Sequence, residues 1–130
     1  MRVYYEDTDF SGVVYHANYL RFFERARTEW LRDLGADAAT LQREHGLAMA
    51  LRHMEVDFLK PARMDDMLDV SVALAYAKRV YFVLDQEAGI AGEPIARCRV
   101  QVACVACEGF VPRPIPGFLL EKLGAAVKNT

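Results

Sequence analysis

The spacing of apolar residues changes once along the chain, and this change constrains the fold more than any other feature. Between Ala17 and Leu34 apolar side chains recur at helical spacing and cover so much of the girth that the predicted helix is mostly buried. From Leu47 onward the spacing becomes two residues, which is typical of strands with one buried face. The pattern predicts an α+β fold in which a curved antiparallel sheet wraps a long central helix.

The individual elements follow from the same spacing and from turn residues. We expect a strand over residues 2–5, helices over 17–34 and 37–45, strands over 47–58, 68–76, 80–88 and 95–107, and a helix over 117–128. Asp37 is a candidate N-cap, and residues 89–94 are expected to form a loop. The sheet would have about five strands. Because the last strand is too long for a small sheet to leave bare at its edge, we expect pairing across a dimer.

Composition narrows the class of protein. The 130 residues carry 16 Lys+Arg against 18 Asp+Glu, which fits one soluble domain over 1–130 and no nucleic-acid partner. No apolar run reaches the ~18 residues of a membrane span, and the acidic start lacks the apolar core of a signal peptide. A strand that begins at residue 2 is abrupt, which leaves open whether a few residues precede Met1.

The three cysteines fit a reducing cytoplasm, since an odd number argues against a disulfide framework. Cys98 and Cys104 share the apolar face of their predicted strand, so we expect them to pack in the core. Their spacing from Cys107, with no histidine nearby, is a poor match to a metal site. We therefore expect no metal.

The polar groups that could carry chemistry gather between Asp7 and His16. Asp7 and Asp9 precede the turn residue Gly12, and His16 lies at the mouth of the long predicted helix, where backbone N–H groups meet the positive end of the helix dipole. A carboxylate against an apolar pocket can act as a general base or as a nucleophile. The alternative is that Asp9 bonds its own backbone in a turn. We expect Asp7 to order the loop.

Several stretches together carry a resemblance to a known family. They are Tyr4-Tyr-Glu-Asp-Thr-Asp9, Gly12-Val-Val-Tyr-His-Ala-Asn-Tyr19, Arg25-Ala-Arg-Thr-Glu29, Pro61-Ala-Arg-Met-Asp-Asp-Met-Leu68 and Pro112-Arg-Pro114. They resemble the hotdog-fold thioesterases of the 4-hydroxybenzoyl-CoA thioesterase type, and most closely the bacterial acyl-CoA thioesterases associated with the Tol-Pal system. The similarity covers nearly the whole chain. It implies a hotdog fold, a dimer or tetramer, and hydrolysis of acyl-CoA without a cofactor.

The resemblance also implies roles for single residues. Asp9 occupies the family's catalytic acid position. The backbone N–H at His16 would donate to the thioester carbonyl as an oxyanion hole, while the His16 ring could position water, protonate the leaving thiolate, or only begin the helix.

The substrate contacts are less specific. We expect five residues beside the acid to line the pocket: Gly12, Val14, Tyr15, Asn18 and Tyr19. For Tyr15, Asn18 and Tyr19, simple packing of the helix is the alternative. Arg63 and Arg79 are the preferred contacts for the phosphates of CoA, although an ordinary solvated charge explains each of them as well.

Two rival functions stay open. The chain could be a partner of acyl carrier protein or of membrane biogenesis that binds acyl chains and hydrolyses them slowly. A hotdog dehydratase shares the fold but carries its acid and histidine on other elements, and nothing in the sequence matches that arrangement. Acyl chain length cannot be inferred, because the residues that close the pocket depend on packing.

Overall fold

The computed structural model describes residues 1–8 and 16–128, without the side chains of residues 16 and 125–128. In chain order the elements are η1 (Tyr5–Asp7), α1 (His16–Asp33), α2 (Ala38–Thr40), η2 (Leu41–His45), β1 (Leu47–Phe58), β2 (Asp69–Ala77), β3 (Tyr81–Ile90), β4 (Glu93–Ala106) and α3 (Gly117–Lys128). η1 is a 3₁₀ helix, and η2 is a π-helical turn that continues α2.

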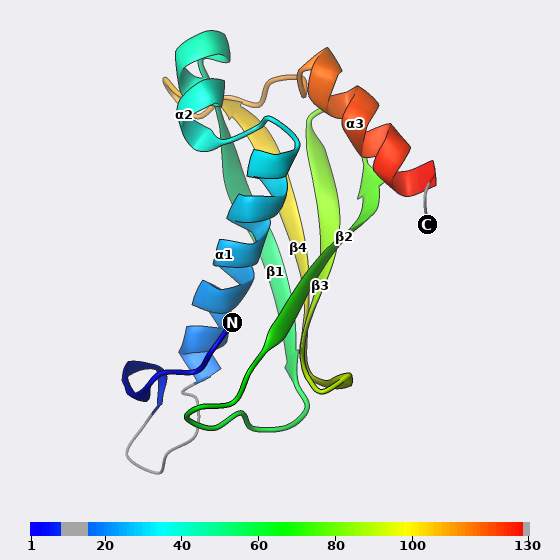
Figure 1. Cartoon of the computed structure of the whole chain (residues 1–130). Helices are drawn as coiled ribbons and strands as arrows, with labels where there is room; N and C mark the ends of the chain where they lie inside the picture. The colour runs from blue at the N-terminus through cyan, green and yellow to red at the C-terminus, as the bar shows by residue number, and fades with distance from the viewer. Residues whose placement is uncertain (9–15, 129–130) are drawn as a thin grey trace.

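The four strands form one antiparallel sheet in the order β1-β4-β3-β2. Figure 1 shows α1 running lengthwise against this twisted sheet, with α2 and α3 at one end of the molecule and the N-terminal segment and the β1–β2 connection at the other. The helix contributes Phe22 and Phe23 to the core, where Phe82, Leu84 and Val100 of the sheet are also fully buried. The predicted α+β architecture, a long helix against an antiparallel sheet, is confirmed.

The ends of the helices follow the local signals. Asp37 caps α2, since its carboxylate accepts a hydrogen bond from the Thr40 N–H at 3.2 Å. Gly46 ends η2 with a φ of 65°, a left-handed conformation that glycine adopts without steric cost. α1 begins at His16, one residue earlier than expected, and Cys98 and Cys104 are buried in the core as predicted.

The expected strand over residues 2–5 is wrong, so the described sheet has four strands and not about five. Arg2 forms only an isolated bridge with Met67, and the chain then turns into η1. The reason is local: the Asp7 carboxylate accepts a hydrogen bond from the Tyr4 N–H, which stabilises a turn over the extended form.

The expected loop over residues 89–94 is also wrong. β3 continues to Ile90 and β4 begins at Glu93, so only Ala91 and Gly92 form the turn. Both have positive φ, 52° and 82°, as a tight hairpin that follows the strand twist requires.

The longest strand is not at an edge, so the argument for dimer pairing that rested on it is wrong. β4 lies between β1 and β3, while β1 and β2 are the edge strands of the described sheet. Strand order depends on which distant segments pair, and the alternation of side chains within one strand gives no information about that pairing.

Candidate active site

The residues expected to react lie around the start of α1. Asp9, Gly12, Val14 and Tyr15 lie outside the described residues, so their predicted roles stay predictions. His16 is described by its backbone alone, as the first residue of α1. The first N–H groups of a helix have no partner within the helix, and the role of the His16 N–H as an oxyanion donor stays a prediction.

Asp7 is buried, with 5% of its surface exposed, and it accepts one hydrogen bond through its carboxylate and one through its backbone carbonyl. Its carboxylate accepts from the Tyr4 N–H at 2.9 Å, and its backbone carbonyl accepts from the side-chain amide of Asn18 at 2.9 Å. These contacts hold Asp7 in place, and its predicted role in ordering the following loop stays a prediction. They also give the Asn18 amide a protein partner, where the sequence predicted a substrate contact.

Tyr19 is buried, and its hydroxyl accepts a hydrogen bond from the Ala62 N–H at 3.0 Å. Burial raises the pKa of this hydroxyl. The ring packs edge-on against Phe22 and tilted against Phe58, with centroid distances of 6.1 and 5.5 Å. Tyr19 therefore fastens the first turn of α1 to the β1–β2 connection, which favours the packing alternative for this residue.

The two arginines expected at the CoA phosphates lie at opposite ends of the molecule. Arg63 is exposed on the β1–β2 connection, at the end where α1 begins. Arg79 follows β2, and its carbonyl accepts from Ile115 just before α3. The nine residues of β2 separate them by about 30 Å. Within one chain, only Arg63 shares the end of the molecule with the start of α1.

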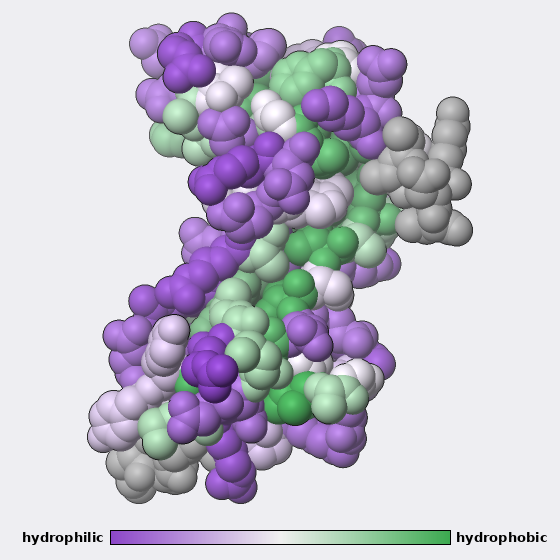
Figure 2. All heavy atoms as spheres, viewed as in Figure 1, coloured by the Kyte–Doolittle hydropathy of each residue, from purple (hydrophilic) through white to green (hydrophobic). Residues whose placement is uncertain are grey.

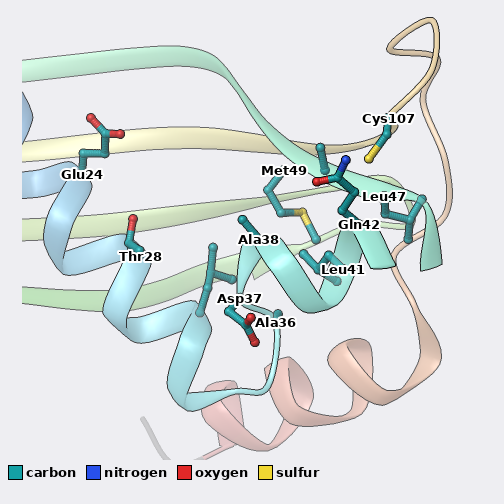
Figure 3. A pocket seen from close by; sticks show the side chains of 12 residues that line it. Glu24, Thr28, Ala36, Asp37, Ala38, Leu41, Gln42, Leu47, Met49 and Cys107 are labelled. Carbon is teal, nitrogen blue, oxygen red and sulfur yellow. The ribbon is translucent and has the colours of Figure 1, made fainter. Parts of the chain in front are cut away.

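Two neighbouring cavities lie between α1 and β1. The first, of about 340 Å³, reaches the α2–η2 segment. In Figure 3 Glu24 and Thr28 extend from α1 toward it, with Leu41 from η2 and Met49 from β1. The second, of about 320 Å³, shares Glu24, Thr28 and Met49 and adds Leu51. Thr28 lies about 18 Å along α1 from His16, so these cavities flank the middle of the helix and not its start.

A buried polar link joins α1 to the sheet, and the sequence did not reveal it. Arg27 donates to the side-chain oxygen of Gln86 at 2.9 Å, and the Gln86 amide donates to the Phe23 carbonyl at 2.9 Å. Burial lowers the pKa of the Arg27 guanidinium. The sequence did contain a signal for this link. Arg27 does not belong to the polar stripe of the helix, which begins with Arg21 and Arg25 and continues at helical spacing, so its charge faces a different side of the helix.

The two buried thiols, Cys98 and Cys104, are poorly suited to nucleophilic chemistry. Burial raises the pKa of Cys98 to about 11 and also raises that of Cys104, so both stay protonated at neutral pH. Among the side chains that the structure describes, no three His, Cys, Asp or Glu gather closely enough to hold a metal ion.

The surface drawn in Figure 2 carries an apolar band down its middle, with hydrophilic residues along both sides.

In the part of the chain that the structure describes, no helix combines the length and the apolar character that crossing a bilayer would require.

Comparison with known proteins identifies the family to which this fold belongs. Residues 3–123 match the model of the thioesterase-like superfamily. The acyl-CoA thioesterase YbgC of Haemophilus influenzae is 40% identical over 116 residues, which are 89% of this chain and 85% of that protein. A probable thioesterase from Bartonella henselae has a TM-score of 0.84 at 38% identity, over 89% of this chain and 95% of the other. Slr0204, a 1,4-dihydroxy-2-naphthoyl-CoA thioesterase from Synechocystis, has a TM-score of 0.86 at 27% identity, over 95% and 92%.

The architecture and these likenesses define a hotdog-fold protein. The chain belongs to the thioesterase-like superfamily, and the expectation drawn from its N-terminal signature is confirmed at that level.

Proposed function

We propose that the protein is an acyl-CoA thioesterase, which uses water to convert an acyl-CoA into a carboxylic acid and free CoA. One observation carries the proposal: the likeness to acyl-CoA thioesterase YbgC spans 89% of the chain at 40% identity. The start of α1 at His16 supports it, because the predicted acid then lies a few residues before a helix N-terminus.

Asp9 carries the chemistry in this proposal. Its carboxylate takes a proton from water, whose oxygen attacks the thioester carbonyl, or it attacks directly and forms a mixed anhydride that water then opens. The N–H at His16 stabilises the oxyanion. The C–S bond breaks, and the CoA thiolate leaves and is protonated. No metal or cofactor takes part.

The assembly we propose is a dimer or tetramer in the cytoplasm. β1 supports it, since this strand of 12 residues is an edge of the described sheet and half of the surface of Leu51 on it is exposed. A long edge strand of this kind favours pairing with a second chain. Arg79 could then reach a CoA bound at the start of a neighbour's α1, which its place in one chain does not allow.

The test is thiol release from a panel of acyl-CoAs that differ in chain length and aromatic character. We expect Asp9→Asn to lower kcat at least about 100-fold, as loss of an acid–base group does. Glu6→Gln is the matched control, because it removes an exposed carboxylate three residues away and should leave kcat within about twofold. Unchanged turnover in Asp9→Asn would overturn the mechanism.

A second measurement separates the rival function. Tight binding to acyl carrier protein, with no turnover of any acyl-CoA by the wild type, would favour a binding partner over an enzyme. A His16→Ala variant with normal rates would confine the role of that residue to its backbone N–H.

A further inference from the structure

A groove runs along the middle of α1, between that helix and β1. The two cavities of about 340 and 320 Å³ are parts of it, because they share the lining residues Glu24, Thr28, Leu31 and Met49. Volumes of this size lie at the lower end of the range for small-molecule sites. This α1–β1 groove is therefore large enough to hold part of a small ligand.

The floor of the groove is apolar. Leu41 and Val102 are buried in it, with 1% and 6% of their surfaces exposed. Leu31 and Met49 are half-buried beside them. An apolar chain placed on this floor is removed from water, which favours an apolar ligand body.

One wall of the groove is polar. Glu24, Arg27 and Thr28 stand at positions i, i+3 and i+4 of α1, so their side chains are neighbours on the helix surface. In Figure 3 Glu24 and Thr28 extend from α1 toward the groove. The Arg27 guanidinium donates once, to Gln86, and forms no ion pair with a carboxylate of the described residues, so it keeps N–H groups to donate.

This wall discriminates between ligand chemistries. Glu24 repels a carboxylate on a ligand, and Arg27 repels an ammonium group. A hydroxyl both donates and accepts, so it can donate to the Glu24 carboxylate and accept from Arg27 or Thr28. The ligand that fits floor and wall together is an apolar chain that ends in a neutral hydroxyl.

The same face of the helix leads back to the start of α1. Leu20 lies one turn before Glu24, and 39% of its surface is exposed. Measured along the helix, Glu24 lies about 12 Å and Thr28 about 18 Å from His16. An extended dodecanoyl chain has a length between these two distances. An acyl group whose thioester lies at the start of α1 therefore reaches the polar wall with its far end.

We propose that the α1–β1 groove holds the far end of the acyl group and selects acyl groups that carry a hydroxyl there. This inference rests on the proposed function, because it requires an acyl-CoA bound at the start of α1. It names a substrate class for that function, the hydroxyacyl-CoAs.

The test compares thiol release from ω-hydroxydodecanoyl-CoA and dodecanoyl-CoA, which differ only in the terminal hydroxyl. We expect the wild type to have a kcat/KM about 5- to 10-fold higher for the hydroxylated substrate, the effect of about one hydrogen bond. A wild-type ratio at or below about one would overturn the proposal.

Two variants locate the preference in the polar wall. Thr28→Val keeps the shape of the side chain but removes its hydroxyl, and Glu24→Leu removes the carboxylate. Each should lower the ratio of the two kcat/KM values at least about twofold, and the double variant should bring it close to one. A ratio that stays at the wild-type value in the double variant would overturn the proposal.

Arg25→Gln is the matched control. Arg25 is exposed on α1 between the two tested positions, but it lines neither cavity. The ratio should stay within about twofold of the wild-type value. A fall as large as in Thr28→Val would assign the preference to the charge of α1 as a whole, against the proposal.

Binding gives a readout that does not depend on turnover. Monomeric ω-hydroxydodecanoate should shift the backbone amide NMR signals of Thr28, Met49 and Leu51, with a Kd at least about threefold lower than that of dodecanoate. Unshifted signals, which a second copy filling the groove would also give, or equal Kd values would overturn the proposal. A wild type that releases no thiol from any acyl-CoA would instead remove the proposed function, and the titration would then decide whether the groove binds hydroxylated chains.

Discussion

The link between Arg27 and Gln86 makes the sharpest prediction about stability. Gln86 is 3% exposed, and its side chain accepts from a half-buried guanidinium and donates to the Phe23 carbonyl. Gln86→Leu removes both bonds and leaves the Arg27 charge without that acceptor. A hydrogen bond to a charged group contributes about 1.5–3 kcal/mol and a neutral one about 1 kcal/mol, so the variant should lose about 2–4 kcal/mol of unfolding free energy.

The assay is thermal and urea unfolding at constant protein concentration. For a chain of this length the loss corresponds to about 8–15 °C in Tm. The double variant Arg27→Met with Gln86→Leu removes the charge together with its acceptor, so it should be more stable than the two single losses predict, by at least about 1 kcal/mol. Gln42→Leu, at an exposed glutamine on η2, is the control and should change stability by less than about 0.5 kcal/mol.

Two results would refute this reasoning. If the two single losses add within about 0.5 kcal/mol in the double variant, Arg27 and Gln86 are not energetically coupled. If Gln86→Leu unfolds like the wild type, water reaches the guanidinium and its burial carries no penalty.

Three further predictions concern single groups. Tyr19→Phe should lose about 1–3 kcal/mol of unfolding free energy, because it leaves a buried backbone N–H without its acceptor; a cost below about 0.5 kcal/mol in urea unfolding would contradict this. Cys98 should react with iodoacetamide far more slowly than the half-buried Cys107 near pH 8, since burial raises the pKa of Cys98 to about 11; mass spectrometry of labelled peptides measures both rates. A hydrogen bond from Arg99 lowers the pKa of Asp85. This exposed pair therefore stabilises the fold at pH values above the ordinary aspartate pKa, and the stabilisation is lost as the pH falls through the lowered pKa. Asp85→Asn should therefore cost at most about 1 kcal/mol at pH 7 and nothing near pH 2, and a cost that grows on acidification would show the sign to be wrong.

Local rules account for most of what could be predicted about the fold. The Asp37 cap, the end of η2 at Gly46 and the alternation along β2 and β4 each depend on residues close together in sequence. The short stretches from Tyr4–Asp9 to Pro112–Pro114 likewise indicated the family, because each of them can be read from neighbouring positions. The candidate site was therefore predictable as a place along the chain.

Contacts between distant segments account for the strand order that the prediction missed. The alternation along β4 is the same for a central strand as for an edge strand, so it could not show that β1 and β3 pair on either side of it. The missed N-terminal strand has a local cause instead, because the Asp7 carboxylate accepts a hydrogen bond from the Tyr4 N–H and stabilises η1.

The sequence by itself determined the long helix, the four strands of the sheet and the superfamily, since periodicity, capping and short sequence signatures are local properties. Only the tertiary structure decided what the polar side chains of α1 bind. Asn18 donates to a carbonyl eleven residues earlier in the chain, and Arg27 meets a glutamine 59 residues later. Such partners meet only after the segments that carry them have packed together, because burial leaves a polar group no water to bind and requires a partner from whichever segment packs against it.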